Sequence, residues 1–318
     1  MSPTDRGGPP GDVVVVGPGA MGCLLAARLS LAGHSVLLLD HDPARAARLA
    51  RDGLALTDPQ GGARLRATVR CTTPPLEAPP ELALVCVKAR STRKALAPLV
   101  GGTGTVALLQ NGVGRFAAAG EFLGAPERVV GLLSTEGATL TDEGAVRHTG
   151  CGRTHVGALR PEQRSRAECV RALLASAGLE ASVVDDLERA EWEKATVNAA
   201  INALCALLDC PNGALLELPT AAELADRAAA ETARVARARG VDGPWTEEQA
   251  QARWRAVAQA TRRNVCSALA DLRRGRATEV FAINGAVARA ARELGLTADT
   301  NETLDLLVAA REAQLRAR

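Results

Sequence analysis

The first half of the chain alternates short apolar runs with amphipathic segments. The apolar runs are Val13–Val16, Val36–Leu39, Leu82–Val87 and Val106–Leu109. Segments with helical spacing lie at Met21–Ala32, Pro43–Asp52 and Pro161–Ala177, and a last strand is expected near Ala181–Val184. Strands that are apolar at every position are buried on both faces. The pattern therefore predicts a parallel sheet with helices on both sides.

The second half is rich in Ala, Leu, Arg and Glu and has helical spacing throughout. The predicted helices are Leu187–Leu208, Ala221–Arg239, Thr246–Arg274, Thr278–Leu294 and Asn301–Arg318. Glycine or proline lies between successive helices, as expected of helix boundaries. The sequence thus predicts an α/β domain over residues 12–185 and an all-helical domain over residues 186–318, after a flexible, Pro/Gly-rich N-terminus at residues 1–11.

Composition removes several classes of function. The 318 residues carry 38 Lys+Arg against 36 Asp+Glu, aromatic residues are 2%, and tyrosine is absent. A nucleic-acid-binding protein usually has a basic surface or aromatic stacking platforms, so that role is not expected. No apolar stretch approaches the roughly 20 residues that span a bilayer, and no secretory signal is evident. We therefore expect a cytoplasmic protein that binds neither nucleic acid nor membrane.

The eight cysteines contain no Cys-x-x-Cys pair and no cluster with histidine at metal-ligand spacing. In a chain of this length, such cysteines are typical of reduced thiols in a cytoplasmic protein. No metal site is expected.

The segment Gly17-Pro18-Gly19-Ala20-Met21-Gly22 matches G-x-G-x-x-G, the dinucleotide-binding fingerprint. Alone the motif is weak, but here it follows the Val13–Val16 strand and opens a helix, which is the context that the fingerprint requires. Gly17 permits a tight turn, Gly19 lets the backbone approach a pyrophosphate, and Gly22 allows close helix–strand packing. We expect a Rossmann-type domain in which residues 17–22, including Ala20 and Met21, contact NAD(P)H; the alternative is a structural glycine turn.

Asp40 ends the second apolar run, 23 positions after Gly17. A carboxylate at that place accepts the 2′-hydroxyl of the NAD ribose and repels the 2′-phosphate of NADP. On this argument NADH is favoured. The alternative is that Asp40 is a solvated loop acid, in which case Arg45 and Arg48 could serve a phosphate.

Lys194, Asn198 and Asn202 lie four residues apart in an otherwise apolar segment. At 3.6 residues per turn they share one face of a helix. Burying an ammonium and two amides among Ala, Val, Ile and Leu costs free energy unless they have partners, and a ligand would supply them. The stripe predicts a binding site; a solvated face or a satisfied structural network is the alternative.

Other polar residues are candidates on weaker grounds. Asn264 and Ser267 are three residues apart on one predicted helix, and Glu279 lies at the start of the next. Each is ordinary taken alone. Lys88 and Asn111 follow two strands of the predicted parallel sheet, where ligands bind in such sheets. An edge lysine and a simple Asn-Gly turn are the alternatives for these two.

In combination these motifs resemble the ketopantoate reductases (2-dehydropantoate 2-reductases) from about Asp12 to about Glu312. In the first half, the segments that carry the resemblance are Gly17–Gly22, Val87-Lys88-Ala89 and Gln110-Asn111-Gly112. In the second half they are Trp192–Lys194 with Asn198 and Asn202, Cys210–Gly213, Asn264–Ser267, Arg276–Glu279 and Ile283–Gly285. The order and spacing of the motifs are specific, although no single one is decisive.

The resemblance implies an NAD(P)H-dependent reduction of 2-dehydropantoate to D-pantoate, as in pantothenate biosynthesis. Lys194 would be the general acid, and Glu279 would pair with it while contacting substrate and cofactor. A nearby ammonium suits this reaction, since hydride transfer to a 2-keto acid leaves an alkoxide that must be stabilised and protonated. The family uses NADPH, and its usual basic residue after the second strand is replaced here by Asp40-His41.

The resemblance also implies roles for the remaining candidates. Asn198 and Asn202 would bind substrate hydroxyl and carbonyl groups, and Asn264 with Ser267 the carboxylate. Asn111 would lie near nicotinamide and substrate, Lys88 near the cofactor ribose, and Glu231 matches an acidic position of the family. The expected binding partner is a small 2-keto acid, and a homodimer is the assembly that the resemblance allows.

Two departures from the family keep other functions open. Cys266 replaces a common Ser beside Ser267, and Ala268 stands where a larger apolar residue is usual. Either change could reshape the substrate pocket. The alternatives are a family member that reduces a different 2-keto acid or a specialised metabolite, and a non-catalytic dinucleotide sensor.

Overall fold

The computed structural model describes residues 13–58, 62, 64–141 and 145–317. The predicted flexible N-terminus, residues 1–11, lies outside the described residues. The described chain divides into two compact units. The first contains the chain up to Gln110 together with Arg115–Leu187, and the second contains Asn111–Gly114 and Glu188–Arg318. The short segment 111–114 is therefore grouped with the second unit, although it lies between two parts of the first.

The first unit is built on a mostly parallel sheet of eight described strands, in the order β12-β11-β8-β7-β6-β1-β2-β5. Their bounds, in that order, are Glu180–Val183, Arg153–Ala158, Val129–Ser134, Thr105–Leu109, Leu82–Val85, Val13–Val16, Val36–Leu39 and Arg70–Thr72. All neighbours pair in parallel except β8 and β11. The strands β1 and β6 are buried at every position, as their unbroken apolar sequences predict.

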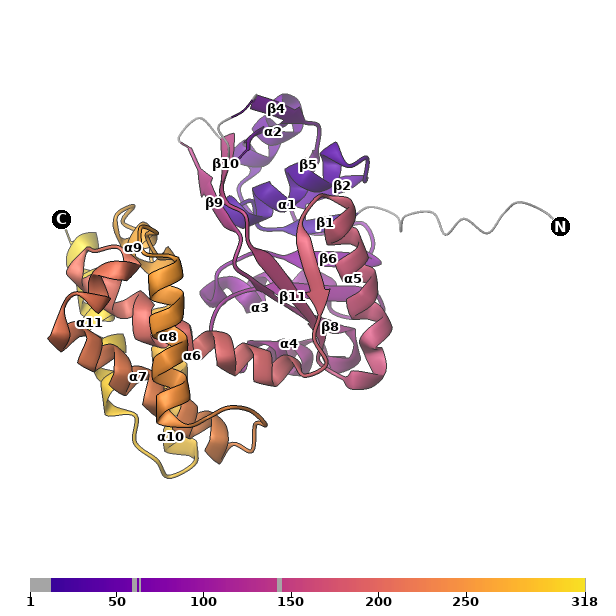
Figure 1. Ribbon diagram of the computed structural model, residues 1–318. Helices are drawn as coiled ribbons and strands as arrows, with labels where there is room; N and C mark the ends of the chain where they lie inside the picture. Colours follow the sequence, from indigo (N-terminus) through magenta and orange to yellow (C-terminus); the bar gives the residue numbers. More distant parts are fainter. Residues whose placement is uncertain (1–12, 59–61, 63, 142–144, 318) are drawn as a thin grey trace. The chain divides into compact units, whose positions relative to one another are not determined.

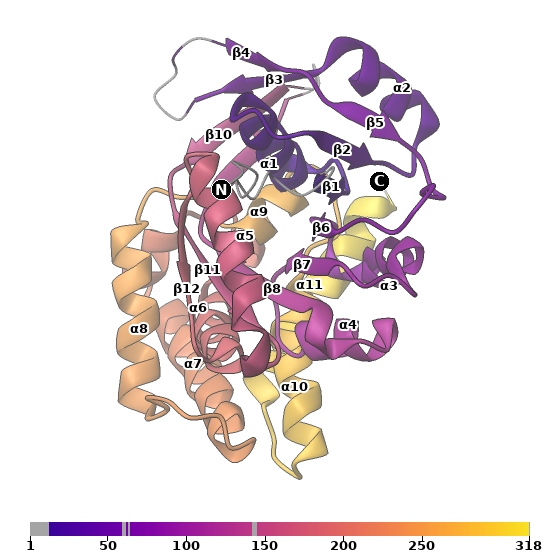
Figure 2. The same cartoon turned by 90° about the vertical axis from the view of Figure 1, so that its right-hand side faces the viewer.

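Helices cover both faces of this sheet. They are α1 (Ala20–Leu31), α2 (Pro43–Asp52), α3 (Thr92–Leu96), α4 (Arg115–Leu123) and α5 (Arg164–Ser176). Short 3₁₀ turns lie at Ala89–Ser91, Ala97–Leu99, Pro126–Arg128 and Pro161–Gln163. Figure 2 shows α1 and α5 on one side of the central strands and α3 and α4 on the other. This arrangement confirms the predicted Rossmann-type α/β fold class of the N-terminal part.

A second sheet in the first unit was not predicted. Its described strands run in the order β4-β3-β10-β9, with bounds Arg64–Ala67, Leu54–Thr57, Ala145–Gly150 and Gly137–Leu140. Helix α1 contacts all four of these strands as well as β1 and β2 of the large sheet. Because α1 is covered from two sides, it is apolar around most of its circumference rather than along one stripe.

A polar chain joins α1 to the second sheet. Arg28 of α1 donates to Nδ1 of His148 on β10 at 3.1 Å and is ion-paired with Asp58. The Nε2 atom of His148 lies 2.6 Å from Glu136 Oε2, and both side chains are only 3% exposed. Since the guanidinium can only donate, His148 Nδ1 accepts and Nε2 carries the proton that it donates to Glu136. Arg28, His148 and Glu136 thus form one chain of hydrogen bonds.

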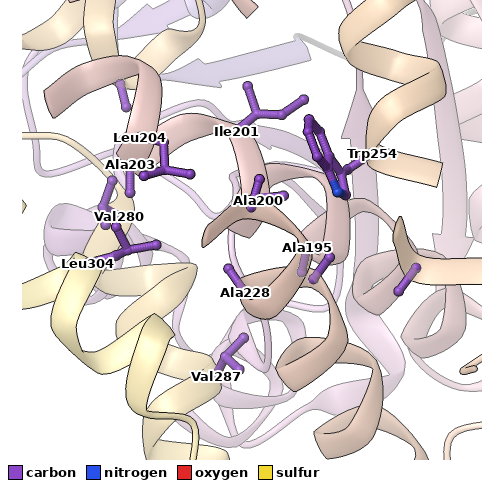
Figure 3. Close-up of a cluster of buried hydrophobic side chains, with 14 of the residues drawn as sticks. Ala195, Ala200, Ile201, Ala203, Leu204, Ala228, Trp254, Val280, Val287 and Leu304 are labelled. Carbon is purple, nitrogen blue, oxygen red and sulfur yellow. The ribbon is translucent and has the colours of Figure 1, made fainter. Parts of the chain in front are cut away.

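The second unit is helical. Its helices are α6 (Leu187–Leu208), α7 (Pro219–Ala238), α8 (Glu247–Ala260), α9 (Ser267–Leu272), α10 (Asn284–Glu293) and α11 (Asp299–Arg316), with 3₁₀ turns at Asn212–Leu216 and Val280–Ala282. Figure 3 shows side chains of α6, including Ile201 and Leu204, in one cluster with Trp254 of α8 and Leu304 of α11. Much of this core is alanine, which lets the helices approach closely. The predicted all-helical C-terminal part is confirmed (Figure 1).

Within the apolar core of the second unit lies one polar network. Asn284 of α10 donates to Ala199 O of α6 and to Asn301 Oδ1 of α11, both at 3.0 Å. Asn301 in turn donates to Glu231 Oε2 of α7 at 2.8 Å. The carboxylate of Glu231 also accepts the N–H groups of Thr300 and Asn301, both at 2.9 Å, in the first turn of α11. One network thus ties four helices together.

Two predicted helices are interrupted, and these predictions were wrong. The helix expected over Thr246–Arg274 ends at Ala260 and restarts as α9 at Ser267. Between them, the carbonyls of Arg262 and Asn264 accept the N–H groups of Gly213 and Asn212, each at 3.0 Å, instead of helical ones. The helix expected over Thr278–Leu294 begins as a 3₁₀ turn, and α10 starts only at Asn284.

Among the described residues, no helix combines the length and apolar character needed to cross a bilayer. Within the same residues, no group of three His, Cys, Asp or Glu side chains is placed to hold a metal ion.

Candidate active site

The glycine fingerprint forms the turn between β1 and α1. Gly17 has φ of +96°, a conformation that favours glycine, and a Cβ there would lie 2.5 Å from Val87 Cγ1. A Cβ on Gly22 would overlap the carbonyl oxygen of Gly17 and lie 3.3 Å from Cys86 Cβ. Gly17 and Gly22 are therefore required by the protein itself, the first by the turn and the second by close packing.

Gly19 differs from these two glycines. It is exposed, its φ of −74° suits any residue, and the nearest atom to an added Cβ is Cys86 O at 4.0 Å. The protein leaves open space where a side chain would stand, beside the N-terminus of the 12-residue helix α1. Helix N-termini bind phosphates through free N–H groups and the helix dipole. The open space beside Gly19, together with the N-terminus of α1, therefore fits a dinucleotide pyrophosphate.

The carboxyl ends of three neighbouring strands meet at this turn. Cys86 N–H, after β6, bonds Val16 O of β1 at 2.9 Å, and Gly17 N–H bonds Leu39 O of β2 at 3.0 Å. Lys88 follows two residues after Cys86, so it lies at the same edge, as predicted. This is the edge at which open α/β sheets bind ligands.

Gln110 holds the loop that carries Lys88. This residue follows β7 and is 3% exposed, and its amide nitrogen donates to Val87 O at 2.8 Å and to Thr92 Oγ1 at 2.7 Å. In the sequence, Gln110 stands out only as part of the Gln110-Asn111-Gly112 motif. A polar residue directly after a buried strand was the signal that could have assigned it this role.

Asp40 lies at the end of β2, but its carboxylate already has partners in the protein. Its side chain is 0% exposed, and Arg45 of α2 donates Nε to Oδ2 at 2.5 Å and Nη2 to Oδ1 at 2.6 Å. Asp42 N–H adds a bond to Oδ1 at 3.1 Å. Burial alone would raise the pKa of Asp40, but the hydrogen bonds from Arg45 and Asp42 and the charge of Arg45 lower it overall. Arg45 remains 36% exposed.

The polar stripe of the second unit is a face of α6. Lys194 and Asn198 are half-buried and Asn202 is 5% exposed, whereas Ala195 and Ala199 beside them are buried. The structure therefore places all three on one continuous helix, as the spacing predicts. Their contacts with a substrate stay a prediction.

Asn111 and Glu279 are brought together in the second unit. The Nδ2 group of Asn111 donates to Glu279 Oε2 at 3.0 Å, although the two residues are 168 positions apart. Val113 N–H donates to Ala282 O at 3.1 Å beside them. A Cβ on Gly112, whose φ is +112°, would overlap Ala282 O, so only glycine permits this approach. The pairing of Glu279 with Lys194 stays a prediction.

Asn264 and Ser267 do not lie on one helix as predicted. Asn264 lies in the turn before α9, Ser267 is the first residue of α9, and both are exposed. The turn is held by Asn212, which is 8% exposed and donates Nδ2 to Thr261 Oγ1 at 2.9 Å. Cys266 precedes α9 as its cap, and its sulfur accepts Leu269 N–H at 3.5 Å.

Two buried carboxylates that no sequence motif indicates hold the segments of Asn111 and Glu279. Glu191 Oε2 accepts Gly114 N–H at 3.1 Å. Glu312 Oε1 accepts both N–H and Oγ–H of Thr278, at 2.8 and 2.7 Å. Nothing in a single sequence distinguishes them from the many other acids of these helices.

Comparisons with known proteins agree on one family. The family model described as Ketopantoate reductase PanE/ApbA matches residues 13–161, and its C-terminal counterpart matches residues 186–312. The chain is 38% identical to a 2-dehydropantoate 2-reductase of Halobacterium salinarum, over 93% of this chain and 97% of that protein. It is 36% identical to one of Archaeoglobus fulgidus, over 95% and 98%.

Solved structures share the fold of this chain. A ketopantoate reductase of Ralstonia eutropha has a TM-score of 0.84 at 27% identity, covering 96% of this chain and 99% of that one. A D-mandelate dehydrogenase with NADH and anilino(oxo)acetate has a TM-score of 0.88 at 25% identity, with the same coverage. The two family models together span most of the chain, and they confirm the resemblance inferred from its motifs: the chain belongs to the ketopantoate reductase family of oxidoreductases.

Proposed function

We propose that the chain reduces the ketone of 2-dehydropantoate to the alcohol of D-pantoate with a nicotinamide dinucleotide, the activity named for its relatives. The observation that carries the proposal is the hydrogen bond between Asn111 and Glu279, two motif residues that only the fold brings together. A sensor that binds a dinucleotide without turning over substrate would not need a proton donor such as Lys194 or an acid such as Glu279. A cytoplasmic location and a homodimer stay predictions.

When bound, the dinucleotide supplies a hydride to the ketone carbon. The Nζ of Lys194 donates a proton to the carbonyl oxygen as negative charge develops on it, which completes the alcohol. Asn198 and Asn202, on the same face of α6, orient the substrate through their amides. Ser267 and Asn264 are exposed and available to bind the carboxylate. Asn111 and Glu279 hold each other at the substrate.

For the cofactor we propose NADPH. The carboxylate of Asp40 is fully covered and bonded to Arg45, so a ribose hydroxyl has no exposed oxygen to approach. The guanidinium of Arg45 is partly exposed, and its charge offsets the repulsion that Asp40 would exert on a 2′-phosphate. This pairing reverses the preference for NADH that Asp40 alone predicts.

The activity is tested by following nicotinamide absorbance with purified protein and 2-dehydropantoate. We expect turnover by the wild type and a loss of at least about 100-fold in kcat for Lys194→Ala, because a positioned general acid contributes 10²–10⁴-fold. Dinucleotide affinity should be unchanged. Turnover of another 2-keto acid but not of 2-dehydropantoate would reassign the substrate, and dinucleotide binding without turnover of any keto acid would favour a sensor.

Cofactor choice is tested by the ratio of kcat/KM for NADPH to that for NADH. We expect the wild-type ratio to exceed one and Arg45→Met to lower it at least about tenfold, the loss of one charge-assisted phosphate contact. Arg51→Met is the matched control, since Arg51 lies on the same helix and also pairs with an acid, Asp52. An equal fall in both arginine variants would contradict the assignment.

A further inference from the structure

We propose that Glu191 is a positioning residue for the reduction: its carboxylate fixes the segment of Asn111 relative to α6, and so relative to Lys194. The inference rests on the proposed function, because it concerns the placement of groups that the reaction uses.

Glu191 lies on the same helix as the proposed acid. It is on α6, three residues before Lys194, so the two are one turn apart on neighbouring parts of the same surface. Glu191 is only 4% exposed, and its Oε2 accepts Gly114 N–H at 3.1 Å. Carboxylates are rarely buried to this degree unless they are paired. The helix that carries the proposed acid therefore also carries the group that grips the Asn111 segment.

The Asn111 segment is also held at its other points. Val113 N–H donates to Ala282 O, and Gly112 packs against that same carbonyl. Asn111 then reaches Glu279 Oε2 at 3.0 Å. Residues 111–114 are thus fastened to the turn after Glu279 on one side and to α6 on the other. Glu191 is the α6 fastening.

These contacts have a consequence for catalysis. If the bond to Glu191 is lost, Asn111 keeps its link to the Glu279 turn, and both can shift together relative to Lys194. Small misplacements of reacting groups lower a rate much more than they lower affinity for a dinucleotide. The expected signature is therefore a fall in kcat at unchanged dinucleotide affinity.

The test compares Glu191→Met, which keeps the volume and removes the acceptor, with Glu191→Gln, which keeps an acceptor oxygen. The control is Glu231→Gln, since Glu231 is also a buried carboxylate that accepts backbone N–H groups in this unit. We measure kcat per folded molecule, KM for 2-dehydropantoate, dinucleotide Kd, and the isotope effect on kcat with deuterated dinucleotide. Hydrogen exchange of residues 112–114 is followed by mass spectrometry.

We expect Glu191→Met to lower kcat at least about tenfold, with a larger isotope effect, a Kd within twofold and faster exchange at residues 112–114. Glu191→Gln should return kcat to within about threefold of wild type. Glu231→Gln should lower thermal stability and leave the isotope effect and the exchange of residues 112–114 unchanged.

Three outcomes would overturn the inference: a kcat for Glu191→Met within twofold of wild type, no rescue by Glu191→Gln, or the same isotope effect in the Glu231 control. If the wild type fails to reduce 2-dehydropantoate, the proposed function fails. The anchoring of residues 112–114 by Glu191 is then tested by hydrogen exchange alone. Unchanged protection of residues 112–114 in Glu191→Met would then refute the anchoring, and loss confined to that variant would support it.

Discussion

Gly19 and Gly22 belong to one motif, yet the structure predicts opposite effects when each is changed to alanine. A methyl group on Gly19 meets nothing in the protein closer than 4.0 Å, and its φ of −74° is open to any residue. Alanine is a poorer helix N-cap than glycine, but it also restricts the unfolded chain. These effects oppose each other, so Gly19→Ala should change the free energy of unfolding by less than about 1 kcal/mol.

A methyl group on Gly22 overlaps the backbone oxygen of Gly17. No side-chain rotation relieves that overlap, so the turn or the helix must move, at about 1–3 kcal/mol. At about 2–4 °C per kcal/mol for a unit of this size, Gly22→Ala should lower Tm by about 2–12 °C. Gly19→Ala should leave Tm nearly unchanged.

Both substitutions should weaken dinucleotide binding. For Gly19→Ala, the weakening should come only from overlap between the added methyl group and the ligand. The added methyl fills the space that the pyrophosphate needs. If the resulting overlap also costs about 1–3 kcal/mol, Kd rises about 5- to 150-fold. Nicotinamide fluorescence gives Kd and a thermal melt gives Tm. A wild-type Kd for Gly19→Ala would refute the placement of the pyrophosphate beside Gly19. A clearly lowered Tm would contradict the open space beside Gly19 in the protein.

Three further predictions follow from contacts in the two units. Asn301→Leu leaves buried groups of the four-helix network unpaired and should lower the free energy of unfolding by about 1–3 kcal/mol in a urea titration. Gly112→Ala should lower kcat with little change in dinucleotide Kd, because its methyl meets Ala282 O; a normal kcat would contradict the close approach. The pKa of Asp40 is lowered in the folded state, so Asp40 contributes stability above its unfolded pKa of about 3.9 and loses it as pH falls through its folded pKa. Asp40→Asn should therefore flatten the acid part of the profile of unfolding free energy against pH. An unchanged acid part would contradict the pairing of Asp40 with Arg45.

Elements with a strong periodic signal were predictable from the sequence. The helix expected over Leu187–Leu208 and that over Pro43–Asp52 have the same bounds in the structure. The four-stranded sheet was not predicted, because its strands are short and its edge strand β4 exposes three of four residues. Their pairing depends on contacts between residues far apart in the chain, such as Ala55 with Ala145, which local periodicity does not contain.

The site shows the same division. The spacing of Lys194, Asn198 and Asn202 and the glycine fingerprint are local patterns, and the structure places them as expected. The break after Ala260 was missed because its cause lies far away in the sequence. The carbonyls of Arg262 and Asn264, which would otherwise continue the helix, accept hydrogen bonds from the N–H groups of Gly213 and Asn212. The partner of Asp40 was missed for another reason: Arg45 is five residues away, and the sequence alone does not distinguish it from the two other arginines of α2, Arg48 and Arg51.

The acidic residues of the second unit show why residue type alone does not assign function. Glu231 matches an acidic position of the family, yet its carboxylate accepts the backbone N–H groups of Thr300 and Asn301. Those donors are fixed by α11, so the carboxylate is committed to holding that helix. Glu279 instead accepts from the side-chain amide of Asn111, which can rotate toward a ligand. The kind of donor that an acid meets, rather than its place in a motif, therefore distinguishes Glu231, whose bonds hold the backbone of a helix, from Glu279, which is bonded to a side-chain amide.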